Sequence, residues 1–427
     1  MRAFYTILYA LGFLLVAPYW LTRGLFNRLY FQTLKRRFIG PGKILPRLGV
    51  KSRVWVWAMS LGEVLSAREL VRELEKDGHE VIISATTLAG LAMAKTNWPN
   101  NVVLPSPLDF SLSIKRFLEH TQPDQLILVE TDIWPGVLLE LKKRSLKASL
   151  VSARLSPRSF KNYRRIKFFW SKVLGLFHLI VAQTPEDRVK FLALGAPESS
   201  VVVGGNLKFD LTEPGPQEKA QAELLRETGW PQARYLVAGS FHPGEDVMIL
   251  EIFQALRKDF PDLRLILAPR DRHKFCQVYR LAEEIFPQQT ARRSKPQPTD
   301  PQSLVFILDT LGELENFYAL AEVALIGKSW PGPHEGGGHN PLEASIRRRA
   351  VLAGPRNHNF KWIYQALSQA GGAIIVDKLE LAPLLKSLLG DLERLQRLGL
   401  AGQQFVAKHR GAVRATLDLL ESPKAPS

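Results

Sequence analysis

Acidic side chains directly follow two apolar runs in the first third of the chain. Ser60-Leu61-Gly62-Glu63 comes after Val54–Ala58, and Glu130 comes after Gln125–Val129. A serine three residues before a glutamate is the capping box that begins many helices, and this explanation suffices for the first motif. The functional alternative is that Glu63, at the carboxyl end of a strand, takes a proton from a substrate hydroxyl as a general base.

Cations follow other apolar runs. Arg154 and Arg270 come shortly after Ala148–Val151 and Leu263–Leu267, and Lys208 follows a pair of glycines. Arg154 is either a solvated cation or a partner for a carboxylate or phosphate. Arg270, preceded by Pro269, could reach a phosphate group.

A glycine-rich segment runs from Gly336 to Glu343 (Gly-Gly-Gly-His-Asn-Pro-Leu-Glu). Glycines let the backbone approach a ligand, and Pro341 is a good first residue for a helix. The start of that helix would direct free N–H groups at a phosphate, and Glu343 could accept hydrogen bonds from a ribose diol. The alternative is a flexible loop capped by Asn340. A second tight strand-to-helix turn is indicated by Gly239-Ser240 and Gly244-Glu245.

Metal-dependent chemistry has no support in the sequence. The chain has one cysteine, Cys276, and lacks both an Asp-x-Asp motif after a strand and a His-Glu-x-x-His motif. The spacing of its histidines suits no zinc site. One cysteine also excludes an internal disulfide framework.

Short apolar runs alternate with helical patterns throughout the chain, which predicts an α/β protein with parallel sheets. We expect two Rossmann-like domains, residues 23–212 and 213–427, with ligands at the carboxyl ends of the strands in a cleft. The Pro/Gly-rich stretch Leu211–Gln217 is the expected linker, and the last helix could pack back on the first domain. The expected strands are Val54–Ala58, Glu80–Ala85, Gln125–Val129, Ala148–Val151, Leu179–Ala182, Val201–Val203, Tyr235–Ala238, Leu263–Leu267, Leu304–Leu308, Val323–Ile326, Val351–Ala353 and Ala373–Val376. Arg292–Gln302 is expected to be a loop with no structural pattern.

The N-terminal residues 1–22 are expected to form a membrane anchor. Ala3–Thr22 carries no charge, and about 20 apolar residues in a helix span the ~30 Å hydrocarbon core. A cleaved signal peptide and a helix lying in the membrane plane are the alternatives. Basic residues directly after the stretch favour a cytoplasmic location for the rest of the chain.

The formal net charge of +16 implies an acidic partner, either nucleic acid, an anionic membrane surface or a phosphorylated substrate. Residues 23–53 contain nine basic and no acidic residues, and residues 142–172 contain eleven and none. A charge run is often only a solvated face. Two runs without counter-ions favour an anionic partner.

In this order, the motifs resemble those of the 3-deoxy-D-manno-octulosonic acid (Kdo) transferases of lipopolysaccharide synthesis. The resemblance implies a GT-B fold and an inverting transfer from CMP-Kdo to lipid IVA, a lipid A precursor, without cofactor or catalytic metal. It implies that the first domain binds the acceptor and the second binds CMP-Kdo, at the inner membrane with both domains on the cytoplasmic face.

The resemblance also implies roles for single residues. Glu63 would be the general base, and Glu130 and Lys208 would stabilise the transition state. CMP would be bound by Pro269, Arg270, Leu311, Gly312, Glu313, Asn340, Pro341, Leu342 and Glu343. Further candidate substrate contacts are Ser240, Arg154, Gly337 and Gly338. The chain departs from the family pattern at Gly136, Asp271 and Lys328, where relatives often carry Asn at the first position and His at the second.

Two other functions fit part of the pattern. One is a different GT-B transferase, such as a lipid A disaccharide synthase that uses a UDP-sugar. The other is a membrane-tethered nucleic-acid-binding protein, which would explain the charge. The chain lacks basic motifs interleaved with aromatic residues, however, and that function leaves the glycine-rich segment unexplained. We therefore expect no nucleic-acid partner.

Overall fold

The structure is a computed structural model of the chain. It describes residues 1–427 except 1, 27, 41, 47–50, 211–223, 226–227, 296–299, 311, 334–335 and 423–427, and it leaves out the side chains of 2–4, 21 and 23–25. The expected linker Leu211–Gln217 lies outside the described residues. The chain forms two compact units: unit 1 is Met1–Leu211 with His409–Ser427, and unit 2 is Thr212–Lys408.

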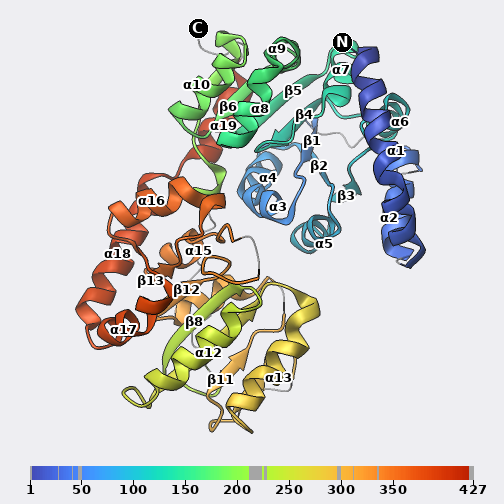
Figure 1. The fold of residues 1–427 in the computed structure, drawn as a ribbon. Coiled ribbons are helices and arrows are strands. Elements are labelled where there is room, and N and C mark those ends of the chain that lie inside the picture. The colour runs from blue at the N-terminus through green and yellow to red at the C-terminus, as the bar shows by residue number, and fades with distance from the viewer. Residues whose placement is uncertain are drawn as a thin grey trace. The chain divides into compact units, whose positions relative to one another are not determined.

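Unit 1 is built on a sheet of seven parallel strands in the order β3-β2-β1-β4-β5-β6-β7 (Figure 1). Its central strands are almost wholly buried, as parallel strands covered on both faces must be. Alternate residues of β1 enter different core layers: Trp55 and Trp57 pack on one face of the sheet and Val54 and Val56 on the other. The strands are β1 (Arg53–Trp57), β2 (Glu80–Ala85), β3 (Val102–Pro105), β4 (Gln125–Val129), β5 (Lys147–Ala153), β6 (Leu179–Ala182) and β7 (Val201–Val203).

Helices cover both faces of this sheet. They are α3 (Leu61–Ser66), α4 (Arg68–Lys76), α5 (Leu88–Asn97), α6 (Ser111–Thr121), α7 (Pro135–Lys143), α8 (Pro157–Arg165), α9 (Lys167–Leu174) and α10 (Pro185–Ala193), with the short 3₁₀ turn η2 (Leu207–Phe209). The last helix, α19 (Ala412–Glu421), also belongs to unit 1, and its Val413 and Leu417 are buried in the core beside α4. The Asp210 carboxylate accepts the backbone N–H groups of Gly411 and Val413 and so fixes the start of α19.

Unit 2 repeats the architecture with the strand order β10-β11-β9-β8-β12-β13-β14, again all parallel. Its strands are β8 (Arg234–Phe241), β9 (Leu263–Pro269), β10 (Thr290–Arg292), β11 (Val305–Ile307), β12 (Val323–Ile326), β13 (Ala350–Ala353) and β14 (Ala373–Ile375). Its longer helices are α12 (Glu245–Leu256), α13 (Phe275–Ile285), α16 (Lys361–Gln369), α17 (Lys378–Leu389) and α18 (Leu392–Lys408), and α14 (Leu314–Phe317) and α15 (Leu342–Ser345) are single turns.

The N-terminal stretch forms α1 (Arg2–Phe26), followed by α2 (Arg28–Ile39). Tyr5, Tyr9 and Phe13 lie on one side of α1, four residues apart, and pack against unit 1: Phe110 contacts the rings of Tyr9 and Phe13, at centroid distances of 4.9 and 5.1 Å. Within the described residues, no helix is both long and apolar enough to cross a membrane.

All twelve expected strands are present, with their ends shifted by at most three residues. Two further strands, β3 and β10, were not expected. β10 falls partly within Arg292–Gln302, so the prediction of a loop from Arg292 onward is wrong at its start. Both strands lie at the edge of a sheet. Thr290–Arg292 forms no apolar run, whereas Val102–Pro105 is an apolar run that the prediction missed.

Candidate active site

Glu63 lies at the carboxyl end of the central strand β1. The Ser60 side chain accepts the Glu63 backbone N–H at 3.4 Å, and the Ser60 backbone N–H donates to the Glu63 carboxylate at 2.9 Å. The predicted capping box is therefore confirmed. The carboxylate is nevertheless only 9% exposed, so it is a buried acid as well as a helix cap.

Glu130 follows β4, the strand that pairs with β1, and it binds two cations. Lys208 forms an ion pair with its Oε1, and the Arg154 Nε lies 3.2 Å from its Oε2. Burial alone would raise the pKa of Glu130, but the charges of Lys208 and Arg154 outweigh it and hold that pKa below its usual value. Glu130 also has a φ of +68°, a left-handed conformation that costs a non-glycine residue free energy.

Glu63, Glu130 and Asp132 form a carboxylate cluster. Burial raises the pKa of Glu63 to about 8, and the charges of Asp132 and Glu130 add to the shift. Burial, followed by the charge of Glu130, raises the pKa of Asp132 to about 6, and its Oδ2 is buried without a hydrogen-bond partner in the described part of the chain. Lys208 and Arg154 both bind Glu130, so Glu63 is the member of the cluster whose pKa is raised furthest.

The segment after Asp132 is anchored by Asp109. Its carboxylate accepts the backbone N–H groups of Gly136 and Val137, at 2.9 and 2.8 Å, which caps the start of α7. A Cβ at position 136 would lie 2.6 Å from the Asp109 carboxylate. This contact disfavours any larger residue at position 136, and the two hydrogen bonds fix the backbone just after Asp132.

In unit 2, the Glu245 carboxylate connects the segments that follow two neighbouring strands, β8 and β12. Its fully buried carboxylate accepts four backbone N–H groups: those of His242 after β8 and of Lys328, Ser329 and Trp330 after β12, at 2.7–3.0 Å. Ser240 and Lys328 both have a positive φ, of 56° and 60°. The turn predicted at Gly239-Ser240 is therefore wrong, because β8 continues through an irregular register to Phe241, whereas Gly244-Glu245 does mark the start of α12.

The glycine-rich segment packs against the protein itself. The Gly337 N–H donates to the Arg356 carbonyl and the Gly338 N–H to the Lys328 carbonyl, each at 2.8 Å. A Cβ on Gly337 would lie 2.3 Å from the Asn359 side chain. The glycines therefore accommodate the loop that carries Arg356 and Asn359, whereas we expected them to accommodate a ligand.

The helix expected to start at Pro341 is a single turn. It begins at Leu342 as α15, with Pro341 at the N-cap position, and ends at Ser345. Asn340 accepts the Leu342 N–H at 3.1 Å. Because the macrodipole needs several aligned peptide groups, this single turn contributes little to phosphate binding.

The remaining candidate residues lie at the carboxyl ends of β8, β9 and β11. Pro269 ends β9 and Arg270 follows it; burial lowers the pKa of Arg270, and the nearby Glu343 carboxylate opposes this shift. Glu313 forms an ion pair with Arg293 at 2.9 Å, and Gly312 has a φ of +89°. Leu311 lies outside the described residues. Asp271, where relatives often have His, caps the turn at His273 through the His273 N–H at 2.9 Å.

Two features of these sites were not among the candidate residues. Asp132 stands two residues after Glu130, and the signal for it was a second acid directly after a buried strand. Glu245 was named only as part of the predicted strand-to-helix turn. Among the described residues, no group of three or more His, Cys, Asp or Glu side chains is arranged to hold a metal ion.

Two parallel seven-stranded sheets with polar groups at the carboxyl ends of their strands define a GT-B-like protein. The fold is similar to that of a solved glycosyltransferase from Rickettsia africae, with a TM-score of 0.56 over 86% of this chain and 97% of that one. Sequence identity between the two is 13%, so this likeness concerns the fold alone.

The family follows from closer relatives. Residues 32–211 match the family described as 3-deoxy-D-manno-octulosonic-acid transferase (kdotransferase). The chain is 34% identical to the 3-deoxy-D-manno-octulosonic acid transferase of Haemophilus influenzae, over 92% of this chain and 91% of that protein. It is 31% identical to the Bordetella pertussis enzyme of the same name, over 86% of each. The chain belongs to this family and is a glycosyltransferase.

Proposed function

We propose that this protein transfers Kdo from CMP-Kdo to a lipid A precursor such as lipid IVA, with Glu63 as the general base. The observation that carries this proposal is the division of charge in the carboxylate cluster. Lys208 and Arg154 both bind Glu130, while Glu63 is buried at the end of β1 beside Asp132. A carboxylate whose pKa is raised by burial and by neighbouring acids is a stronger base once it is ionised.

The reaction is an inverting displacement. An acceptor hydroxyl gives its proton to Glu63 while its oxygen attacks the anomeric carbon of Kdo. The bond between that carbon and the phosphate oxygen breaks on the opposite face, and CMP leaves. Glu130, held by Lys208, supports this step by fixing the backbone on which Asp132 stands and by keeping two cations beside the reacting groups.

Unit 2 supplies the donor site. Arg270 after β9 is the candidate partner for the donor phosphate, and Glu343 is the candidate acceptor for the ribose hydroxyls. A guanidinium can neutralise the phosphate charge that develops as CMP leaves, and for this reason we propose that the transfer needs no metal ion.

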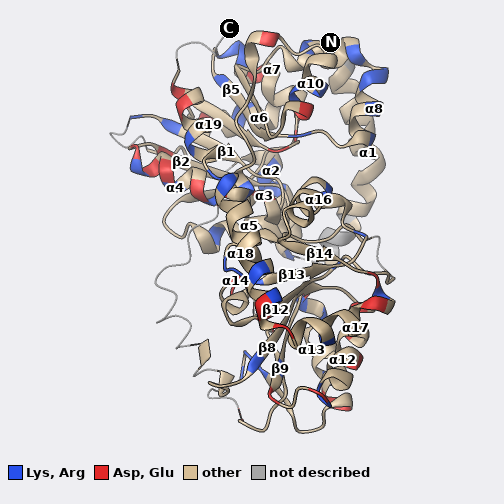
Figure 2. Ribbon diagram, turned by 90° about the vertical axis from the view of Figure 1, so that its left-hand side faces the viewer, with Lys and Arg blue, Asp and Glu red and all other residues tan. Residues whose placement is uncertain are grey.

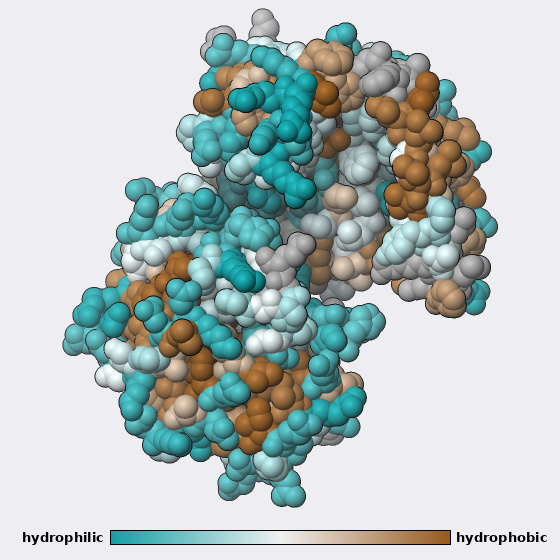
Figure 3. Space-filling model, viewed as in Figure 1, coloured by the Kyte–Doolittle hydropathy of each residue, from teal (hydrophilic) through white to brown (hydrophobic). Residues whose placement is uncertain are grey.

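We further propose that α1 and the basic stretches attach the protein to the cytoplasmic face of the inner membrane. The side of α1 opposite Tyr5 and Tyr9 exposes apolar side chains, and Figure 3 shows them gathered along this helix. Leu14 and Leu15 are 65% and 83% exposed. A helix docked by one face and apolar on the other is suited to insert its outer face among lipid chains.

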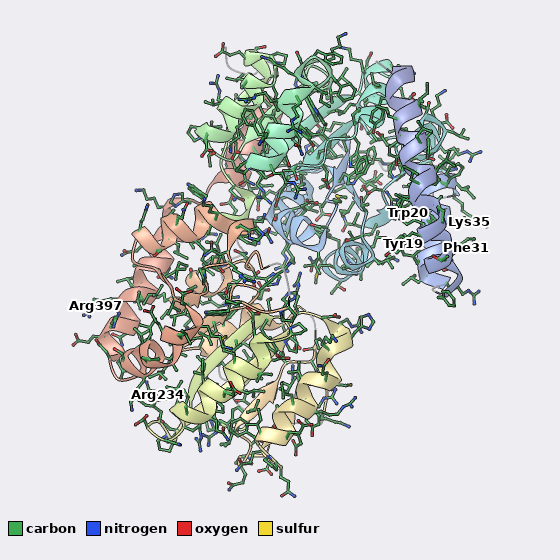
Figure 4. The ribbon with its side chains drawn as sticks, viewed as in Figure 1. Tyr19, Trp20, Phe31, Lys35, Arg234 and Arg397 are labelled. Atoms are coloured by element: carbon green, nitrogen blue, oxygen red, sulfur yellow. The ribbon has the colours of Figure 1, made fainter. Side chains whose placement is uncertain are left out.

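Other helices of unit 1 carry further apolar and basic groups. Figure 4 places Tyr19 and Trp20 on α1 and Phe31 and Lys35 on α2, in the same part of unit 1. Figure 2 shows basic residues on α8, where Arg158, Lys161, Arg164 and Arg165 are exposed. An anionic leaflet attracts such residues by about 1 kcal/mol each.

The proposed function is tested by mass spectrometry of lipid IVA after incubation with the full chain and purified, pre-formed CMP-Kdo, with and without EDTA. A product heavier by one or more Kdo units, formed also in EDTA, is expected. Unmodified lipid with intact donor would refute the transfer. Activity that EDTA abolishes and magnesium restores would refute the metal-independent mechanism alone.

A further inference from the structure

Unit 2 contains a pocket of about 530 Å³ that lies apart from the candidate nucleotide contacts. It opens at the carboxyl ends of β13 and β14, because Pro355 just after β13 and Ile375 at the end of β14 both line it. Ligands of open parallel sheets bind at this edge. The pocket therefore lies where a substrate group is expected to bind. None of the candidate site residues follows β13 or β14.

The polar groups of the pocket wall suit an anionic sugar. They comprise three side-chain amides, two hydroxyls, one imidazole and one ammonium group, and no acidic side chain: Asn357, Gln365, Gln369, Ser368, Tyr364, His358 and Lys361. Amides and hydroxyls can both donate to and accept from sugar hydroxyls. Lys361 is exposed and has no carboxylate partner among the described residues, so its charge is available to a ligand.

The pocket is joined directly to the glycine-rich segment. The Tyr364 hydroxyl on its wall donates to the His339 carbonyl at 2.9 Å, and the Asn359 N–H donates to the Gly337 carbonyl at 2.9 Å. The candidate CMP contacts Asn340–Glu343 follow immediately in the chain. The ends of β12 and β14 lie two strand spacings apart, roughly 10 Å. One ligand can span this distance.

We propose that this pocket receives the sugar-acid half of the donor, with Lys361 binding its carboxylate and the amide side chains binding its hydroxyl groups. The proposal rests on CMP-Kdo being the donor, as given under the proposed function. It makes Lys361 a specificity residue, because a neutral sugar nucleotide would gain nothing from the ammonium group.

The test compares Lys361→Gln with Lys378→Gln in the full-length protein. Both lysines are exposed and stand at the first position of a helix in unit 2, but Lys378 does not line the pocket. Lys361→Gln is expected to raise the KM for CMP-Kdo about tenfold or more, as the loss of a charge-assisted hydrogen bond does. The inhibition constant of free CMP and the KM of the acceptor should stay unchanged, and Lys378→Gln should behave as wild type.

The other outcomes overturn the proposal. Equal weakening of CMP and CMP-Kdo would place Lys361 at the nucleotide, and a higher acceptor KM alone would make the pocket an acceptor site. No change in any constant would leave the lysine outside both sites. Binding of CMP-Kdo and CMP to Glu63→Gln protein, with and without Lys361→Gln, gives the same comparison without turnover. A wild-type protein that transfers no Kdo would refute the proposed function, while this binding comparison would still decide the subsite.

Discussion

The Lys208 ammonium forms an ion pair with the Glu130 carboxylate, which is 3% exposed and stands on a backbone with positive φ. Lys208 follows β7, at the edge of the sheet, whereas Glu130 follows β4 in its middle. The pair therefore connects segments 78 residues apart and brings a cation to the carboxylate cluster.

Lys208→Met should destabilise unit 1 by about 3–5 kcal/mol, because it leaves a buried carboxylate with only Arg154 as its cation. Adding Glu130→Gln should recover much of this loss, because it removes the buried charge, and the Arg154 side chain that loses its ion-pair partner is 38% exposed. Chemical denaturation measures both effects. If the double variant regains stability but not turnover, the pair serves the reaction; if Lys208→Met alone is as stable as wild type, the ion pair is unimportant.

Glu63→Gln should reduce turnover by about 10²–10⁴-fold, the usual contribution of a general base. Glutamine can still serve in the capping box, so the fold should persist. The matched control is Glu69→Gln, which alters a buried glutamate on the next helix that pairs with Arg72. Near-normal turnover by folded Glu63→Gln protein would leave Glu63 as a helix cap only.

Activity should depend on pH through Glu63. Its pKa is about 8, and the base must be ionised, so kcat/KM should rise with pH and level off above about 8. Asp132→Asn removes a charge that raises this pKa, so the rise should move to lower pH. An unshifted profile in a folded Asp132→Asn protein would show that Asp132 does not act on the base.

The same shift predicts a pH-dependent stability. The pKa of Glu63 lies above its usual 4.5 in the folded protein, so folding favours the protonated acid, and its contribution to stability is lost as pH rises through about 8. Glu63→Gln cannot ionise. The melting temperature of Glu63→Gln, relative to that of wild type, should therefore increase from pH 5 to pH 9. A constant difference between the two melting temperatures would contradict the raised pKa.

Arg270→Ala should weaken donor binding by roughly 1.5–3 kcal/mol, the value of a charge-assisted contact to phosphate. Unlike Lys361→Gln, it should raise the inhibition constant of CMP and the KM of CMP-Kdo together, because the phosphate is common to both. Unchanged CMP inhibition would remove Arg270 from the site.

Replacing Leu14 and Leu15 together with Gln should weaken binding to anionic vesicles tenfold or more, since a buried leucine contributes about 1.5 kcal/mol or more. Leu379 and Leu392 on α17 and α18 are 89% and 57% exposed and provide the matched control. Equal vesicle binding by both double variants in a sedimentation assay would exclude α1 as the attachment site.

The strands of the two sheet interiors were predictable because a parallel strand covered on both faces is a short unbroken apolar run. Gln125–Val129 and Val323–Ile326 match the structure to the residue. The edge strand Thr290–Arg292 was not predicted, because all three of its residues are half-buried and they form no apolar run.

The candidate site was predictable only as far as local sequence determines it. The Ser60–Glu63 capping box is local and was found. Nothing local indicates that Lys208 binds Glu130, or that Gly337 accommodates Asn359 and not a ligand, because both contacts depend on how distant segments pack. Asp132 is a site residue only because burial and Glu130 shift its pKa.

The helix α19 has a consequence for how the protein is made. Ala412, Val413 and Leu417 fill the core of unit 1, yet the ribosome adds them after every residue of unit 2. During synthesis unit 2 is therefore the first to have its whole sequence available, while unit 1 keeps an open apolar surface beside α4. A nascent chain stalled near Lys408 would present that surface to chaperones, although all seven strands of its first sheet had already emerged.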